Sequence, residues 1–173
     1  MKFFLAILPI ALMGCSAATT ANINVPTEET QSMFRKINDN ISVSPQISLD
    51  DVAAAKAEGV TLIINNRPDG EDPSAPQSAD IEAAARAAGM KYIAIPITHS
   101  GFSGPQVDAM IAALADGDKT LAYCRSGTRS TLLWSLAQAK QGVAPEEISR
   151  LAGNAGYDIT PVRAMVDALA AGS

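Results

Sequence analysis

The stretch LAYCRSGTRSTLLW, residues 121–134, determines which class of fold the chain can adopt. Its apolar start extends the run Lys119–Tyr123 and predicts a buried strand that ends directly at Cys124. Its end predicts a helix, because apolar residues then recur at helical spacing, at Leu132, Leu133, Leu136 and Ala137. The nine residues from Tyr123 to Thr131 hold a cysteine, two arginines, a glycine and five hydroxyls, one of them from the tyrosine. The stretch therefore predicts a strand, a reactive loop and a helix in direct succession.

Strand and helix signals alternate along the rest of the chain. Apolar runs rich in β-branched residues predict strands at Ile41–Val43, Val60–Ile64, Lys91–Ile97 and Lys119–Tyr123. Ser48, Ser78 and Ser103 are predicted to cap the starts of three helices, and two shorter helices close the chain. The last of these starts at Thr160-Pro161 and is expected to bury Val162, Met165, Val166 and Leu169. This alternation predicts an α/β fold, with a central parallel-rich sheet and helices on both faces.

Polar segments follow three of the predicted strands, after Ile64, Ile97 and Tyr123. Sites in parallel sheets form at the carboxyl ends of the strands, so these segments are expected to meet at one edge of the sheet. The chemistry of the loops then decides what the site does.

The loop after Tyr123 is suited to holding an anion against a thiolate. Cys124 is the candidate nucleophile, because a helix N-terminus and neighbouring arginines favour the thiolate form of a cysteine. Arg129 is the candidate oxyanion ligand, since a guanidinium can donate two N–H groups to one anion. The candidate substrate-binding residues of the loop are Arg125, Ser126, Gly127, Thr128 and Ser130. Ser130 or Thr131 is a candidate donor to the sulfur, and a buried structural cysteine is the alternative interpretation of Cys124.

The N-terminus predicts export from the cytoplasm. Residues 1–15 have a basic start and an apolar run that is too short to span a membrane. Their end, Leu12-Met13-Gly14-Cys15, resembles a bacterial lipobox, so we expect lipidation at Cys15, with plain cleavage near Thr20 as the alternative. Ser16 as the next residue favours the periplasmic face of the outer membrane. Residues 16–33 are then a flexible tether, and residues 34–173 form the folded domain.

Composition excludes several classes of partner and cofactor. The formal net charge is −5 and no cluster of lysines and arginines occurs, so we expect no nucleic acid partner. The chain has one histidine and two cysteines, too few for a zinc site once Cys15 carries lipid. We find no glycine-rich fingerprint and expect no metal or other cofactor. With Cys15 lipidated, Cys124 has no partner for an intramolecular disulfide. The oligomeric state is left open.

Four segments together resemble one known family: SVSPQIS, IINNRPDGE, YIAIP and LAYCRSGTRSTLLW. They are similar to the beta-lactamase hydrolase-like phosphatase family, and the likeness extends from about Phe34 to Asp158. The resemblance implies a fold of the dual-specificity phosphatase type and a cysteine-dependent phosphatase that forms a phosphocysteine intermediate. It implies a small anionic or phosphorylated substrate. Some members of the family are named sulfur transferases.

The spacing between Cys124 and Arg129 keeps a second activity open. Tyrosine and dual-specificity phosphatases place the arginine six positions after the cysteine, and that position is Ser130 here. Arg129 lies five positions after Cys124, which is the rhodanese length. The alternatives are therefore sulfur transfer through a Cys124 persulfide, and a non-catalytic module that binds anions.

The general acid of a phosphatase has two candidates. By resemblance, the acid lies in the loop after the strand that precedes the cysteine strand, where this chain has His99. Asp69, in the loop Asn66–Glu71, is the rival. Arg67 in the same loop either adds positive charge for the substrate or pairs with Asp69 or Glu71.

Overall fold

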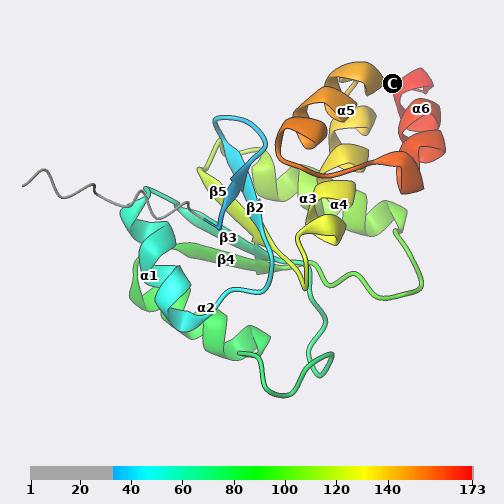
Figure 1. The fold of residues 1–173 in the computed structure, drawn as a ribbon. Helices are drawn as coiled ribbons and strands as arrows, with labels where there is room; N and C mark the ends of the chain where they lie inside the picture. The colour runs from blue at the N-terminus through cyan, green and yellow to red at the C-terminus, as the bar shows by residue number, and fades with distance from the viewer. Residues whose placement is uncertain (1–32, 173) are drawn as a thin grey trace, which may run out of the picture. The chain divides into compact units, whose positions relative to one another are not determined.

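The computed structural model describes residues 33–172, which lie within the unit Ser32–Ser173. Segment 1–15, with Cys15, and all but the last residue of the predicted tether lie outside the described residues. Within residues 33–172, five strands form one sheet in the order β1-β2-β5-β3-β4 (Figure 1). The strands are β1 Arg35–Lys36, β2 Ile41–Ser44, β3 Leu62–Asn65, β4 Lys91–Ala94 and β5 Thr120–Tyr123. Only β1 pairs antiparallel, so the predicted parallel-rich sheet is confirmed.

Helices cover both faces of this sheet, as the alternating pattern predicts (Figure 1). One face carries α1 Leu49–Ala57 and α2 Ser78–Ala87. The other face carries α3 Gly104–Leu114, α4 Thr128–Lys140, α5 Pro145–Asn154, the 3-10 turn η1 Thr160–Val162 and α6 Arg163–Ala171. None of the helices in this part of the chain has the length and apolarity needed to cross a bilayer.

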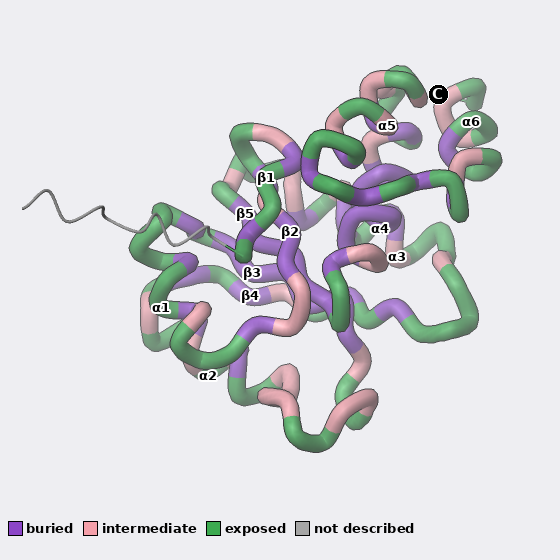
Figure 2. Tube along the Cα trace, viewed as in Figure 1, coloured by how far each residue is buried: buried purple, intermediate pink, exposed green. Residues whose placement is uncertain are grey.

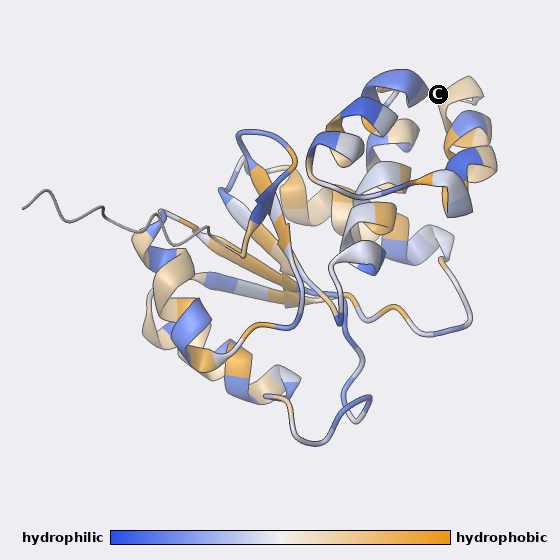
Figure 3. Cartoon of the chain, viewed as in Figure 1, coloured by the Kyte–Doolittle hydropathy of each residue, from blue (hydrophilic) through white to orange (hydrophobic). Residues whose placement is uncertain are grey.

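The sheet separates two apolar cores. Successive residues of a strand point to opposite faces, so Ile64 joins the core under α3 and α4 whereas Ile63 joins the core under α1 and α2. The first core includes Trp134 of α4, which is buried. Every residue of β3 and β5 is buried, and these strands are the apolar centre of the molecule (Figures 2 and 3). A sheet covered on both faces explains why its strands are continuous apolar runs rather than alternating ones.

Element boundaries follow local capping with a few differences from the prediction. The predicted start of α1 is confirmed, because the backbone N–H of Asp51 bonds the Ser48 hydroxyl and that of Ser48 bonds the Asp51 carboxylate. Helix α2 begins one residue earlier than expected. Its N-cap is Gln77, since the carboxylate of Asp80 accepts from the Gln77 backbone N–H.

Two further expectations from the sequence are wrong. Strand β4 ends at Ala94 instead of Ile97, because β3 leaves the ladder after Asn65: the Arg67 N–H bonds the Asn65 side chain, and the Ile97 N–H bonds the Asn66 carbonyl. In the last helix Val162 and Val166 are buried, but Met165 is 44% exposed. Its position in α6 faces away from the core that Val166 enters.

The parallel register brings three loops to one place. Tyr123 of β5 pairs with Ser44 of β2 on one side and with Asn65 of β3 on the other. The segments that follow these three residues therefore leave the sheet at the same level. The segment after Ala94 leaves beside the one after Asn65. The site is expected where these segments meet.

Candidate active site

Cys124 lies between the end of β5 and the start of α4, and its side chain is fully buried. The backbone N–H of Gly127 donates to its Sγ atom at 3.1 Å. Helix α4 begins one residue later, at Thr128, so the sulfur lies at the positive end of a helix. Both features stabilise negative charge on Sγ, as the sequence predicts for this loop.

Gly127 is required by the backbone and by a neighbour. Its φ is +87°, a conformation that residues with a Cβ rarely adopt. A Cβ at this position would lie 2.0 Å from the Tyr157 hydroxyl oxygen. That hydroxyl donates to the Ser126 carbonyl at 3.2 Å. Tyr157 belongs to the segment between α5 and η1, and the sequence alone did not indicate it as a site residue.

Arg129 is anchored on the same side of the loop. Its Nη1 donates to the Ile97 carbonyl at 2.7 Å, and its Nη2 donates to Glu71 Oε2 at 2.8 Å. Burial disfavours the charged guanidinium, but the hydrogen bond to Glu71 and the nearby sulfur of Cys124 outweigh it, so the pKa of Arg129 is raised. Arg129 therefore stays charged close to Cys124.

Glu71 is a second residue of the site, after Tyr157, that the sequence did not indicate as such. Its Oε2 accepts from Arg129 and also from Arg67 Nε at 2.7 Å. The hydrogen bond from Arg129 is the largest cause that lowers the pKa of Glu71, and the bond from Arg67 adds to it against the effect of burial. We expected Arg67 either to add charge for the substrate or to pair with Asp69 or Glu71, and the ion pair between Arg67 and Glu71 is confirmed. The pair with Arg129 spans 58 residues and left no local signal.

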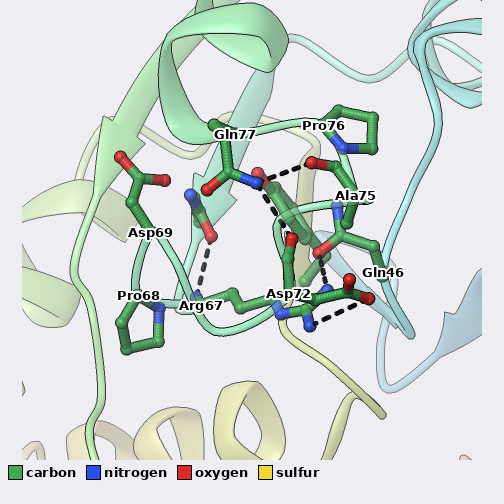
Figure 4. A pocket seen from close by; sticks show the side chains of 10 residues that line it. Gln46, Arg67, Pro68, Asp69, Asp72, Ala75, Pro76 and Gln77 are labelled. Atoms are coloured by element: carbon green, nitrogen blue, oxygen red, sulfur yellow. Dashed lines mark hydrogen bonds and ion pairs between the residues drawn. The ribbon is translucent and has the colours of Figure 1, made fainter.

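Arg67 is buried, with 8% of the residue exposed, and its side chain links two loops (Figure 4). Besides Glu71, it donates through Nη1 to Gln46 Oε1 at 2.8 Å, and its Nη2 lies 3.6 Å from Asp72. The backbone N–H of Gln46 in turn donates to the Arg125 carbonyl at 3.3 Å. The contacts form a continuous chain from Arg125 through Gln46, Arg67 and Glu71 to Arg129.

The loop that carries Glu71 is held in shape by its own side chains. The side-chain amide of Gln77 accepts from the Gly70 N–H of this loop. It also donates to the Asp72 carbonyl (Figure 4). Asp69 is exposed, and its carboxylate accepts from the backbone N–H of Ser78 at 2.7 Å. The structure thus places Asp69 at the start of α2, where it supports the helix.

His99 lies in the exposed turn after β4. It is two residues from Ile97, whose carbonyl binds Arg129. This places the His99 turn against the arginine side of the loop.

The remaining predicted site residues differ in exposure. Arg125 is exposed, and the Ser126 hydroxyl donates to that of Thr128 at 3.1 Å. The Thr131 hydroxyl donates to the Gly127 carbonyl at 3.0 Å rather than to sulfur. The Ser130 hydroxyl is buried and has no hydrogen-bond partner among the described residues. Across residues 33–172, His, Cys, Asp and Glu side chains nowhere gather in a group of three that would hold a metal ion.

A fold with a parallel-rich sheet, a cysteine at the end of its central strand and an arginine in the following helix defines a phosphatase-like α/β domain. The chain belongs to the beta-lactamase hydrolase-like protein, phosphatase-like domain family, whose model matches residues 33–141. Beta-lactamase hydrolase-like proteins of Xylella fastidiosa and Agrobacterium fabrum are 32% and 31% identical to it, over 71% and 72% of this chain. The chain spans 29% of the length of these relatives.

Solved structures agree with this assignment. A crystal structure of a candidate phosphatase from Neisseria meningitidis has a TM-score of 0.68 and 31% identity, over 79% of this chain and 97% of that one. A kinase-associated phosphatase in which serine replaces the catalytic-site cysteine has a TM-score of 0.60 and 17% identity, over 76% of this chain and 88% of that one. The second likeness shows the fold. The expected fold of the dual-specificity phosphatase type is confirmed.

Replacing Glu71 by glutamine should lower the free energy of unfolding by about 2 kcal/mol at neutral pH, because two arginines lose a charged acceptor. The pKa of Glu71 is lowered on folding from an ordinary value of 4.5, so its contribution is complete above about pH 4.5 and disappears as the pH falls through the lowered pKa. Denaturant unfolding of wild type and Glu71→Gln from pH 7 to pH 3 measures this difference.

Glu82→Gln is the matched control. Glu82 pairs with Arg86 on the exposed surface of α2, where an ion pair contributes about 0.5 kcal/mol or less. A Glu71→Gln difference as small as that of the control, or one that stays constant down to pH 3, would contradict the role assigned to Glu71.

Proposed function

We propose that the domain hydrolyses phosphoesters through a covalent phosphocysteine on Cys124. The observation that carries the proposal is the convergence of Sγ, the Gly127 N–H and the Arg129 guanidinium at the start of α4. A thiolate needs its charge stabilised before attack, and a phosphoryl group needs donors for its oxygens in the transition state. In this proposal the Gly127 N–H and the start of α4 stabilise the thiolate, and Arg129 with the loop amides binds the phosphoryl oxygens.

The proposed reaction has two steps. The Cys124 thiolate attacks phosphorus, a P–S bond forms, and the ester P–O bond breaks while protonated His99 gives its proton to the departing oxygen. Water then attacks phosphorus and passes a proton to His99, and the P–S bond breaks to release inorganic phosphate and the thiolate. Arg129 binds the phosphoryl oxygens throughout, and Glu71 holds Arg129 in position. The buried Ser130 hydroxyl is available to donate to the departing sulfur.

The comparisons support this proposal in two ways. The family is described as phosphatase-like, and the kinase-associated phosphatase with the same fold has a catalytic-site cysteine. The substrate is proposed to be a small anionic or phosphorylated compound, because the loop offers donors for one anionic group. Arg67 acts in this scheme through Glu71, since its guanidinium contacts Glu71, Gln46 and Asp72.

Sulfur transfer is the second candidate function, and one observation favours it. The loop from Cys124 to Arg129 is one residue shorter than in tyrosine and dual-specificity phosphatases, so its cradle is smaller. A persulfide on Cys124 would fit such a cradle and would need no general acid.

Cys124→Ser should lower turnover of an aryl phosphate by more than about 10³-fold, because the serine hydroxyl is a far weaker nucleophile at neutral pH. Steady-state kinetics of the two proteins measure the loss, and mass spectrometry of the quenched wild type shows phosphate on Cys124. Cys15→Ser, which replaces the only other cysteine, is the matched control and should keep wild-type turnover.

Thiosulfate-to-cyanide transfer, assayed in parallel, separates the two functions. Turnover of thiosulfate alone, with an adduct of roughly 32 Da on Cys124, would establish sulfur transfer in place of hydrolysis. Full phosphatase activity in Cys124→Ser would exclude the thiolate mechanism.

His99→Ala should slow hydrolysis of alkyl phosphates by about 10²-fold, since a poor leaving group needs a proton from the acid. Phosphates with nitrophenol leaving groups, which depart as stable anions, should change little. Plots of kcat/KM against the pKa of the leaving group measure this dependence. If Asp69→Asn steepens the plot and His99→Ala does not, Asp69 is the acid instead.

We also propose that the domain is anchored at the periplasmic face of the outer membrane through lipid on Cys15. The lipobox-like stretch supports this. Metabolic labelling with a radioactive fatty acid should mark the wild-type chain, and Cys15→Ser should lose the label and leave the membrane fraction. A wild-type chain that takes up no label would indicate plain cleavage.

A further inference from the structure

Two carbonyls of the loop face away from Cys124 toward donors outside the loop. The Arg125 carbonyl accepts from the backbone N–H of Gln46, at 3.3 Å. The Ser126 carbonyl accepts from the Tyr157 hydroxyl, at 3.2 Å. The two donors come from different parts of the chain, one from the segment after β2 and the other from the segment after α5.

The direction of a carbonyl determines the direction of the next N–H. In a planar trans peptide the C=O of one residue and the N–H of the following residue point to opposite sides. Because Tyr157 holds the Ser126 carbonyl outward, the Gly127 N–H must point inward. That N–H is the one that donates to Cys124 Sγ at 3.1 Å.

We propose that Tyr157 is a positioning residue, which orients the peptide between Ser126 and Gly127 so that its N–H faces the reacting sulfur and the bound oxyanion. The role builds on the proposed function, in which loop amides bind a phosphoryl group. It adds a residue that lies beyond the matched family segment, residues 33–141. The C-terminal part of the chain thereby completes the anion-binding loop.

Tyr157 is itself held firmly enough for this role. Its residue is 9% exposed, and the Arg35 guanidinium lies over its ring at 5.2 Å from the centroid. The hydroxyl end approaches the Cα of Gly127 so closely that only glycine fits there. Burial raises the pKa of Tyr157 despite the opposing charge of Arg35, so the hydroxyl keeps its proton and remains a donor at neutral pH.

The glycine and the tyrosine depend on each other. The positive φ of Gly127 turns the chain into α4, and the missing side chain leaves room for the Tyr157 hydroxyl. Without that hydroxyl, the outward carbonyl loses its donor, and only the bond from the Gly127 N–H to Sγ opposes rotation of the peptide plane. Rotation would turn a carbonyl oxygen toward Sγ and repel both the thiolate and an oxyanion.

The test is Tyr157→Phe, which keeps the ring and its contact with Arg35 and removes only the donor. We expect kcat/KM for an aryl phosphate to fall about tenfold, and the inhibition constant of inorganic phosphate to rise by a similar factor. The amide resonance of Gly127 should shift upfield in the NMR spectrum, because its hydrogen bond to sulfur weakens. The unfolding midpoint should change little.

Tyr92→Phe is the matched control. Tyr92 is equally buried, and its hydroxyl bonds Asn65 and Ser78 without contacting the loop from Cys124 to Arg129. This variant should lose stability but keep the kcat/KM, the phosphate inhibition constant and the Gly127 amide shift of the wild type. Equal losses of activity in the two variants would show general loosening and overturn the positioning role.

The outcomes also separate this inference from the proposed function. A wild-type protein that neither hydrolyses nor binds phosphate would refute the proposed function, and the Gly127 amide shift would still test Tyr157. An unchanged shift in Tyr157→Phe would overturn the positioning role, and so would wild-type values of both kcat/KM and the phosphate inhibition constant.

Discussion

The carboxylate of Glu71, shared by Arg67 and Arg129, is the interaction on which the rest of the site depends. Two guanidinium groups this close would repel each other, and a single carboxylate between them removes the repulsion. The bond to Glu71 fixes the direction of the Arg129 guanidinium, which also binds the Ile97 carbonyl and lies near Cys124. Arg129 therefore keeps its positive charge beside the sulfur. Glu71, with Asp72 near Arg67, thus makes two positive charges, one buried and one half-buried, compatible with a folded loop.

This interaction also links loops that the sheet only brings near one another. The register places the ends of β2, β3 and β5 side by side, but each strand end alone would allow many loop conformations. Gln46, in the segment after β2, accepts from Arg67 in the segment after β3. Glu71, in the same segment as Arg67, accepts from Arg129 of α4. Tyr157 adds a donor from the C-terminal segment. The loop from Cys124 to Arg129 is therefore shaped by residues outside it as much as by its own glycine.

Sequence patterns predicted the parts of this protein that depend on local chemistry. Glycine at 127 indicated the turn, and Ser48 with Asp51 indicated the start of α1, because both effects act within four residues. Cys124 and Arg129 indicated a loop that binds an anion beside a thiolate, because the two residues lie close together in the sequence. The α2 start and the end of β4 differed slightly, since the side chains of Asp80 and Asn65 each bind a particular backbone N–H that period alone does not locate.

Taken by itself, the sequence determined the class of fold, with Cys124 at the end of a strand and Arg129 at the start of the helix that follows. Burial follows the period of apolar residues, and helix starts follow short-range hydrogen bonds, so both can be inferred from order along the chain. Tertiary structure alone decided that Glu71 binds Arg129 across 58 residues, that Asp69 supports α2, and that Tyr157 lies against Gly127. Contacts of this kind arise when separate segments pack around a sheet, and no periodicity or spacing along the chain encodes which side chains then meet.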